Sequence, residues 1–158
     1  MSLLALALLA LNVSILSSPN QATLHAQQIS INTAKVVTGC TVIDSPGIYV
    51  LAQDISGTYP GEYWCIKINA SNVVLDGQGH SITVLEEGLN EGIYVYFADN
   101  VTIRNTKITG YWHGIFLAFS YYDTITDNIL ANNDFGIYLY ISSYNKITGN
   151  VFINDGLY

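Results

Sequence analysis

Basic residues are scarce in this sequence. Five lysines and arginines stand against twelve aspartates and glutamates among 158 residues, which gives a formal net charge of −7. Nucleic acids and anionic lipid headgroups both attract basic protein surfaces, so this charge balance argues against either as a partner. Neutral glycans, cations or another protein fit the charge better.

A hydrophobic run long enough to span a membrane is missing near the N-terminus. The apolar stretch from Leu3 to Leu16 is interrupted only by Asn12 and Ser14, and it is shorter than the roughly 18 residues expected of a membrane-spanning helix. No Lys or Arg precedes it, yet its length and position favour a secretion signal. We therefore predict that residues 1–26 are a signal peptide or a retained hydrophobic segment, and that the chain is extracellular or at the cell surface.

Cysteines are also few. Cys40 and Cys65 are the only two, and two thiols alone cannot complete a structural zinc site. An even pair in an exported chain favours a disulfide. This bridge is predicted to tie the first coil of an internal repeat to the segment before it.

Three glycines mark that repeat. Gly92, Gly114 and Gly136 follow one another at intervals of 22 residues, and each opens the same phrase of glycine, isoleucine, aromatic residue and branched apolar residue. Isoleucine also recurs eleven residues after each glycine. A period this short, rich in β-branched and aromatic residues and without a helical stripe, predicts stacked β-coils.

The repeat extends towards the N-terminus. Residues 70–75 align with residues 98–103, with an insertion between them that falls at 85–91. This places about four coils of roughly 22 residues over 65–158. The preceding residues 27–64 are predicted to form an N-terminal cap with the first strands.

The last residues of the sequence fall inside the repeat. Gly156-Leu157-Tyr158 lies in the last turn of a coil, with no polar capping segment after it. An uncapped coil leaves strand edges and interior apolar side chains exposed. We therefore expect the coils to continue beyond this fragment, or another subunit to stack at this end.

Alternation within each coil assigns side chains to faces. A strand turns successive residues to opposite sides, so Ile93 and Val95 are predicted inside and Tyr94 outside. Matching positions then form columns across the coils. The predicted interior columns are Ile66/Ile93/Ile115/Ile137, Ile68/Val95/Leu117/Leu139, Leu75/Ile103/Ile125/Ile147 and Ile82/Ile108/Ile129/Val151. The last column requires a bulge near Asn105 to keep its register.

The chain resembles a known family over residues 36–158. The run from Cys40 to Leu51, the segment Cys65-Ile66-Lys67-Ile68 and the phrase from Asn72 to Ile82 resemble the opening of archaeal surface and secreted proteins. The later coils are similar to NosD-like repeats and, more distantly, to the pectin-lyase-like superfamily. The resemblance implies an all-β fold, a right-handed single-stranded parallel β-helix. It does not imply one activity, because such repeats occur in lyases, hydrolases, epimerases, adhesins and surface scaffolds.

A catalytic role would fall on few residues. Pectin-lyase-like enzymes use clustered carboxylates with a basic residue, and the alignment of coils places Asp76 beside Arg104 on the outside. If the chain is an enzyme, the residues that resemblance implies are Asp76, Arg104 and Asp127. An exposed salt bridge explains the first two more simply, and Asp127 has no second carboxylate in its column. We therefore favour a non-catalytic chain.

Metal ligands are sparse as well. Glu86, Glu87 and Glu91 crowd one loop and could hold calcium, although a charged loop is usually only solvated. NosD proteins are associated with copper maturation of nitrous oxide reductase, and copper prefers Met, Cys or clustered His. Met1 is the only methionine, and His80 and His113 lie on different coils at non-equivalent positions. No bound cofactor is predicted, and copper delivery is not supported.

Aromatic side chains give the strongest functional signal. Two neighbouring outward rows are predicted on one face: Tyr94/Phe116/Tyr138 and Tyr96/Ala118/Tyr140. Exposed rings in rows can stack against the apolar faces of sugars or against another protein. Stacked rings also stabilise adjacent strands without any ligand, so a purely structural role remains open.

The sequence therefore predicts a non-catalytic, exported β-helix domain that binds carbohydrate or protein or serves as a scaffold. A polysaccharide lyase or hydrolase and an end-to-end assembly module are the alternatives. The expected partner is a polysaccharide or a surface protein, with no nucleic acid. Asn69 and Asn100 open glycosylation sequons, which an exported chain can carry. The predicted ligand-binding residues are Tyr94, Tyr96, Phe116, Tyr138 and Tyr140.

Overall fold

The computed structural model describes residues 34–85 and 90–156. All of the described residues belong to one compact unit, residues 34–158. The predicted signal segment, residues 1–26, lies outside the described part, as do Glu86 and Glu87 of the predicted calcium loop. Within the described residues, no helix is long and apolar enough to cross a membrane.

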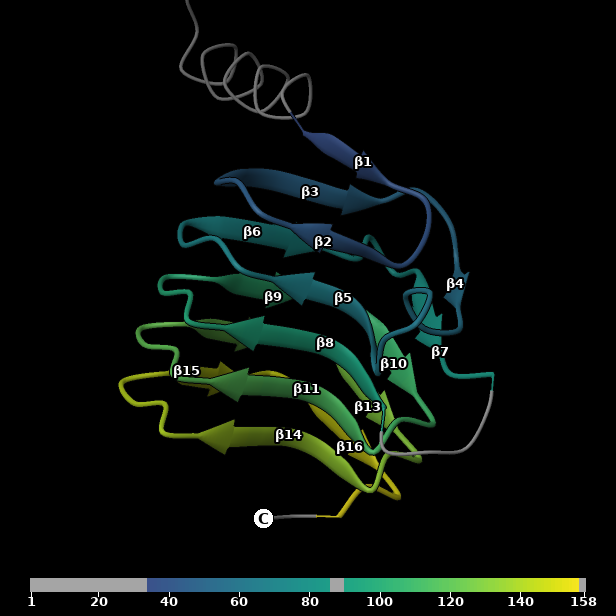
Figure 1. Cartoon of the computed structure of the whole chain (residues 1–158). Helices are drawn as coiled ribbons and strands as arrows, with labels where there is room; N and C mark the ends of the chain where they lie inside the picture. The colour runs from purple at the N-terminus through teal and green to yellow at the C-terminus, as the bar shows by residue number, and fades with distance from the viewer. Residues whose placement is uncertain (1–33, 86–89, 157–158) are drawn as a thin grey trace, which may run out of the picture. The chain divides into compact units, whose positions relative to one another are not determined.

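The described residues form a parallel β-helix in which each coil contributes one strand to each of three sheets (Figure 1). In Figure 1 the strands of the front sheet run from right to left, and those behind it run from left to right, while the chain descends. This course makes the helix right-handed. The predicted all-β, right-handed parallel β-helix is confirmed.

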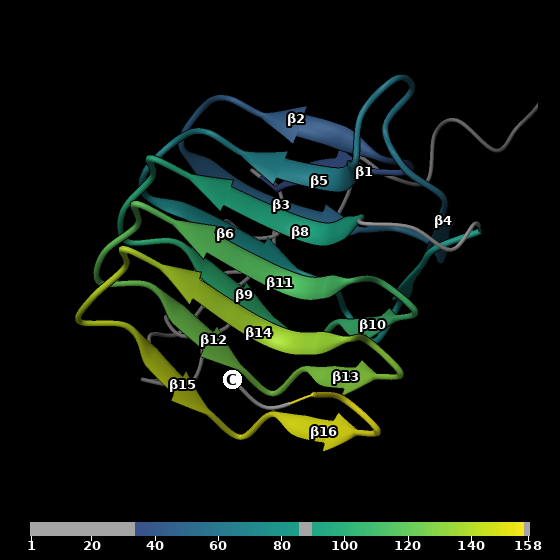
Figure 2. The same cartoon turned by 60° about the horizontal axis from the view of Figure 1, so that its bottom comes forward.

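The three sheets run along the axis of the helix, and Figure 2 shows their strands stacked in order. Sheet A consists of β1 (Lys35–Val37), β3 (Gly47–Leu51), β6 (Val73–Asp76), β9 (Thr102–Arg104), β12 (Thr124–Thr126) and β15 (Lys146–Thr148). Sheet B consists of β2 (Thr41–Ile43), β5 (Trp64–Ile68), β8 (Glu91–Tyr96), β11 (His113–Ala118) and β14 (Phe135–Tyr140). Sheet C consists of β4 (Ile55–Ser56), β7 (Ser81–Thr83), β10 (Lys107–Thr109), β13 (Ile129–Ala131) and β16 (Val151–Ile153).

The segment predicted to hold the cap and first strands contains β1 to β4. Strands β2, β3 and β4 pair in parallel with β5, β6 and β7, so they form a coil of the same kind as those that follow. Four more coils begin at β5, β8, β11 and β14, as predicted. Strand β1 extends sheet A by pairing with β3.

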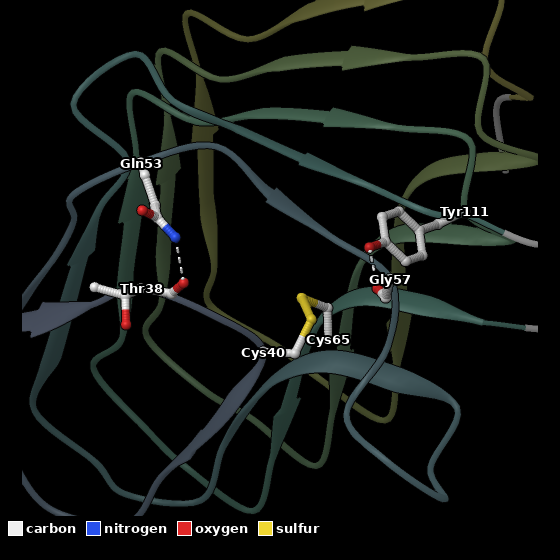
Figure 3. The surroundings of a disulfide bond; sticks show 6 residues. All are labelled: Thr38, Cys40, Gln53, Gly57, Cys65 and Tyr111. Carbon is white, nitrogen blue, oxygen red and sulfur yellow. Dashed lines mark hydrogen bonds between the residues drawn. A yellow bond between two sulfur atoms is a disulfide. The ribbon is translucent and has the colours of Figure 1, made fainter.

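The disulfide joins the first two of these coils (Figure 3). Thr41 pairs with Ile66 in sheet B, so the residues before them, Cys40 and Cys65, lie opposite each other on neighbouring coils. Their Cα atoms are 4.5 Å apart. The predicted pairing is confirmed. Figure 3 also shows the buried Tyr111, whose hydroxyl donates a hydrogen bond of 2.8 Å to Gly57 O across the interior.

Three of the four predicted interior columns are confirmed by the strand register. Ile93 pairs with Ile115, and Ile115 with Ile137, while Ile103 pairs with Ile125. Side chains in the middle coils are fully buried. Burying these branched side chains contributes about 1.5–3 kcal/mol for each one and holds the coils together.

In the fourth predicted column, Ile82 and Ile108 are correct, but Ile129 and Val151 are wrong. Ile108 pairs with Leu130, and Leu130 with Phe152, while Ile129 is exposed on the outer face of sheet C. The predicted bulge is absent because Asn105 and Asp127 take the same left-handed conformation, with φ of 53° and 56°. The corner therefore keeps one length in both coils, and the interior column on sheet C is Ile82/Ile108/Leu130/Phe152.

The last described coil is less buried than the one before it. Leu139, Ile147 and Phe152 continue interior columns but are exposed, whereas their neighbours Leu117, Ile125 and Leu130 are fully buried. Strands β14, β15 and β16 are the edge strands of their sheets in the described part of the chain.

The repeated glycines allow neighbouring coils to approach closely. A Cβ atom on Gly92 would lie 2.6 Å from Gly114 O and 2.7 Å from Ile108 Cγ2. A Cβ atom on Gly114 would lie 2.7 Å from Gly136 O. Real Cβ atoms do not approach backbone oxygens this closely, so the spacing of the coils on sheet B requires glycine at these positions.

Asparagine side chains bond the backbone at the corners between sheets. In each case Oδ1 accepts the N–H of the residue 22 positions earlier and Nδ2 donates to the carbonyl 25 positions earlier. The residues that do this are Asn128, Asn133, Asn145 and Asn150. Such bonds satisfy backbone groups that the corners would otherwise leave unpaired. Side-chain amides also bond one another between coils: Asn128 Nδ2 donates to Asn150 Oδ1, and Asn154 Nδ2 donates to Asn132 Oδ1.

Asp123 occupies the place of Asn145 one coil earlier. Its Oδ1 accepts the Val101 N–H at 2.8 Å, as an asparagine would. The carbonyl 25 positions earlier, Ala98 O, instead accepts from Ser120 Oγ, which also contacts Asp123 Oδ2. One hydroxyl hydrogen cannot serve two acceptors. Burial raises the pKa of the Asp123 carboxyl, against the lowering effect of its bonds with Ser120 and Val101.

Replacing Asp123 by asparagine is expected to raise the free energy of unfolding at pH 7 by about 1 kcal/mol, because an amide supplies the missing donor. The raised pKa means that this aspartate's contribution to stability is complete below its ordinary pKa and is lost as pH rises through the folded value. The gain of Asp123→Asn should therefore shrink as the pH falls towards about 4. Urea unfolding from pH 4 to 8 measures it.

The reverse exchange one coil later is the matched control. Asn145→Asp should lower stability at pH 7 and less so in acid, because it creates the same unpaired acceptor. A gain for Asp123→Asn that is independent of pH, or a loss at pH 7, would contradict this reading of the corner.

Candidate functional site

The predicted aromatic rows lie together on the outer face of sheet B, which lies towards the viewer in Figure 2. In β8, β11 and β14 the missing Cβ of each repeated glycine faces inward, and the isoleucine after it also belongs to the core columns. The next residue then faces outward. The residue two positions later faces outward as well. We call the aromatic side chains at these outward positions the aromatic face; it consists of Tyr94, Tyr96, Phe116, Tyr138 and Tyr140.

Ring contacts make this face continuous across three coils. Tyr94 stacks on Phe116 with ring centroids 5.1 Å apart, and Phe116 contacts Tyr138 at 5.5 Å. Tyr94 also contacts Tyr96 within β8, at 5.3 Å. Such pairs contribute about 0.5–1.5 kcal/mol beyond their burial. The rings therefore stabilise the stack of coils, while four of them are half-buried and Tyr140 is exposed.

A single lysine lies at the N-terminal end of these rows. Lys67 pairs with Tyr94 in the strand register, and its Nζ lies 5.5 Å from the ring centroid of Tyr94 and 5.1 Å from that of Tyr96. It also lies 5.8 Å from the ring of Trp64. Attraction between the ammonium group and the ring faces holds this charge against the aromatic surface.

A histidine and a glutamate lie beneath the rings at the start of the strands. Neither residue was predicted to belong to a site on sheet B. His113 pairs with Glu91, and its Nδ1 lies 3.6 Å from Glu91 Oε1. The imidazole is buried, stacks on Tyr138 at 4.8 Å, and its Nδ1 has no hydrogen bond. Both residues directly precede a repeated glycine, which is the signal that could have placed them side by side. Glu91 thus contacts this face of sheet B.

Tyr94 keeps its proton well into the alkaline range. Burial raises the pKa of its phenol to about 12, with smaller contributions from Tyr96 and from the negative charge of Glu91. A neutral phenol can both donate and accept a hydrogen bond. Tyr94 is therefore neutral at any physiological pH.

The residues suspected of catalysis form an outer contact on sheet A. Asp76 and Arg104 pair across coils, and Arg104 Nε donates to Asp76 Oδ2 at 2.9 Å. The other carboxylate oxygen accepts from Asn105 Nδ2 and from the Gln78 N–H. Asp127 accepts a hydrogen bond from Thr126. The carboxylate of Asp76 is thus engaged on both oxygens, in an ion pair with an exposed arginine that is worth about 0–1 kcal/mol.

The two sequons differ in their surroundings. Asn69 follows β5 and is exposed. Asn100 is exposed too, but its Nδ2 donates a hydrogen bond of 2.8 Å to Asn72 Oδ1 on the preceding coil. Glycosylation of Asn100 would have to break this contact, whereas no such bond from the side chain of Asn69 stands in the way.

A right-handed parallel β-helix with asparagine corners and a continuous aromatic row defines a β-solenoid repeat protein. The chain belongs to the NosD family, because the family model described as periplasmic copper-binding protein (NosD) matches residues 19–158. Comparison with the curated proteins and with the solved structures gives no match. The family description names the periplasm, which is consistent with an exported protein.

The copper in that family description finds no matching set of ligands in residues 34–85 and 90–156. No group of three or more His, Cys, Asp and Glu side chains in this part could hold a metal ion. Both cysteines are in the disulfide, and His80 and His113 each lie beside a carboxylate, Asp54 and Glu91. The soft or clustered donors that copper prefers are not assembled by these side chains.

Proposed function

We propose that this chain is an exported β-helix domain that binds neutral polysaccharide on its aromatic face. The observation that carries the proposal is the alignment of Tyr94, Phe116 and Tyr138, with Tyr96 and Tyr140 beside them, on one side of sheet B across three coils. Rings in such a row offer apolar surface for sugar C–H groups, and the tyrosine hydroxyls offer hydrogen bonds.

The charges on this side of the molecule favour a neutral ligand. The ammonium group of Lys67 is held against three rings, and the carboxylate of Glu91 lies beside His113. The chain as a whole carries a net charge of −7. An acidic polymer would be repelled by this net charge, whereas a neutral polymer would not.

Export is supported by two observations. The disulfide between Cys40 and Cys65 is of a kind that persists in oxidising compartments outside the cytosol. The family description adds the periplasm. Polysaccharides of the cell envelope are present in the compartments to which an exported chain is delivered, so location and ligand class agree.

Affinity electrophoresis of the full chain tests the proposal. Gels containing hydroxyethylcellulose, galactomannan or dextran are compared with plain gels and with gels containing polygalacturonate. We expect retardation by at least one neutral polymer and none by polygalacturonate. Tyr138→Ala with Tyr140→Ala should weaken binding at least about fivefold, since each ring contact is worth about 0.5–1.5 kcal/mol.

The control variant removes exposed apolar surface from another face. Ile129→Ala lies on the outer face of sheet C and should leave retardation unchanged. Circular dichroism verifies that each variant keeps the β-helix. Failure of every neutral polymer to retard the wild-type chain would refute the proposal for those polymers, and equal loss in Ile129→Ala would show that the face is not specific.

A further inference from the structure

The left-handed backbone conformation recurs at four positions in each of the last three coils. All have φ between 48° and 85°. Coil by coil, they are Phe97, Asn100, Asn105 and Gly110; Phe119, Tyr122, Asp127 and Asn132; and Ile141, Tyr144, Gly149 and Asn154.

Two of these four columns follow the preference of the backbone. The corner between sheets A and C carries Asn105, Asp127 and Gly149, and the following corner carries Gly110 and asparagines. Glycine, asparagine and aspartate are the residues that adopt this conformation with least strain. At these two corners, residue type and conformation agree.

The two columns at the corner between sheets B and A do not follow this preference for glycine, asparagine and aspartate. One carries Phe97, Phe119 and Ile141, and the other changes from Asn100 to Tyr122 and Tyr144. Bulky and β-branched residues are strained in this region. We call Phe97, Phe119, Ile141, Tyr122 and Tyr144 the corner row.

Burial does not explain four of these five side chains. Phe97 is 61% exposed, Ile141 56%, Tyr122 63% and Tyr144 77%, whereas Phe119 is half-buried. Their rings stack in pairs, Phe97 on Phe119 at 4.6 Å and Tyr122 on Tyr144 at 5.2 Å. The chain therefore places large apolar groups in solvent at positions where the backbone favours small polar residues, and this combination marks a contact surface.

The corner row is continuous with the aromatic face. Tyr96 contacts Phe97 at 4.6 Å, and Phe119 contacts Tyr140 at 5.5 Å. The row carries no charged side chain, and it presents similar groups from each coil at the strand spacing of about 4.8 Å. A surface that repeats along an axis suits a ligand that repeats along its own length.

We propose that the corner row extends the polysaccharide site around the edge of sheet B, so that a neutral linear glycan lies along the axis of the β-helix and contacts successive coils. This inference rests on the proposed function of the aromatic face. Because the ligand supplies the reason for the bulky side chains, their removal should relieve backbone strain and weaken binding together.

The test is the double variant Tyr122→Asn with Tyr144→Asn in the full chain. Asparagine already occupies this column at Asn72 and Asn100, where the two side chains are hydrogen-bonded. We expect a higher urea midpoint than in the wild type. We also expect at least about fivefold weaker binding in the gel that retards the wild type, because two ring contacts are lost.

The control is Tyr63→Asn, which removes an exposed tyrosine before β5, at the opposite end of the sheet B strands. Its urea midpoint should not rise above that of the wild type, and its retardation should equal that of the wild type. A higher midpoint with unchanged binding overturns the corner row as a contact but leaves the aromatic face standing, provided that Tyr138→Ala with Tyr140→Ala still loses binding. A lower midpoint shows that the rings serve to stabilise the corner and also overturns the inference. No retardation of the wild type overturns both proposals.

Discussion

Replacing Gly114 by alanine is expected to lower the free energy of unfolding by about 1–3 kcal/mol, the range for overpacked sites. A Cβ atom there would lie 2.7 Å from Gly136 O and 2.8 Å from Leu130 Cδ2. The first contact is with backbone of the neighbouring coil, so no side-chain rotation can relieve it. Relief requires the coils to move apart and to lengthen the hydrogen bonds of sheet B. Urea unfolding followed by circular dichroism measures the loss.

Gly39 provides the matched control for that experiment. A Cβ atom on Gly39 would have no neighbour within 4 Å, and its φ is not in the left-handed region. Gly39→Ala should therefore be neutral or stabilise by up to about 1 kcal/mol, through a smaller entropy of the unfolded chain. If Gly114→Ala is as stable as Gly39→Ala, close approach of the coils is not the reason for the repeated glycine.

Removing the disulfide should have the second large effect. Cys40 and Cys65 close a loop with a sequence separation of 25, and opening a loop of this size costs about 3 kcal/mol in the chain-entropy model. The double variant Cys40→Ala with Cys65→Ala is expected to lose this amount relative to the oxidised chain. Unfolding of the wild type with and without a reductant gives an independent value.

The double variant also controls for the reductant. Dithiothreitol should lower the urea midpoint of the wild type and leave that of the variant unchanged. A wild-type midpoint that does not move under conditions shown by thiol titration to reduce the bond would contradict a stabilising role for the bridge between the first two coils.

The repeat predicted most of the fold because one requirement recurs in every coil. Gly92, Gly114 and Gly136 permit close approach, and each is followed by an inward isoleucine and an outward aromatic residue. Pairing of matching positions then follows from the stacking of coils. Alignment of the coils also predicted the contact between Asp76 and Arg104.

The prediction failed for the interior column of sheet C, because residues were assigned to it by hydrophobicity and not by the conformation of the corners. Ile129 and Val151 were placed inside because they are apolar, and a bulge was required to keep that register. The structure instead turns Leu130 and Phe152 inward, because Asn105 and Asp127 make corners of the same length. A strict spacing of 22 residues, applied without correction, would have given the observed column.

The site was predicted less completely than the fold. The aromatic face follows from alternation, but Glu91 and His113 come together only because both precede a repeated glycine at the same register position. Asp123 was missed because an aspartate is not read as a member of an asparagine ladder. The left-handed conformation of Phe119 and Ile141 opposes their residue type, so propensity alone would assign them to strands.

Nuclear magnetic resonance of the full chain, labelled with 13C-tyrosine, tests glycan binding on the aromatic face at single side chains. The chain is titrated with oligosaccharides cut from the neutral polymer that retards it, and ring signals are assigned with Tyr→Phe variants. We expect saturable shifts for Tyr94, Tyr138 and Tyr140, with the signal of Tyr49 unmoved. Shifts absent from these three tyrosines, or confined to tyrosines away from sheet B, would contradict a glycan site on the aromatic face.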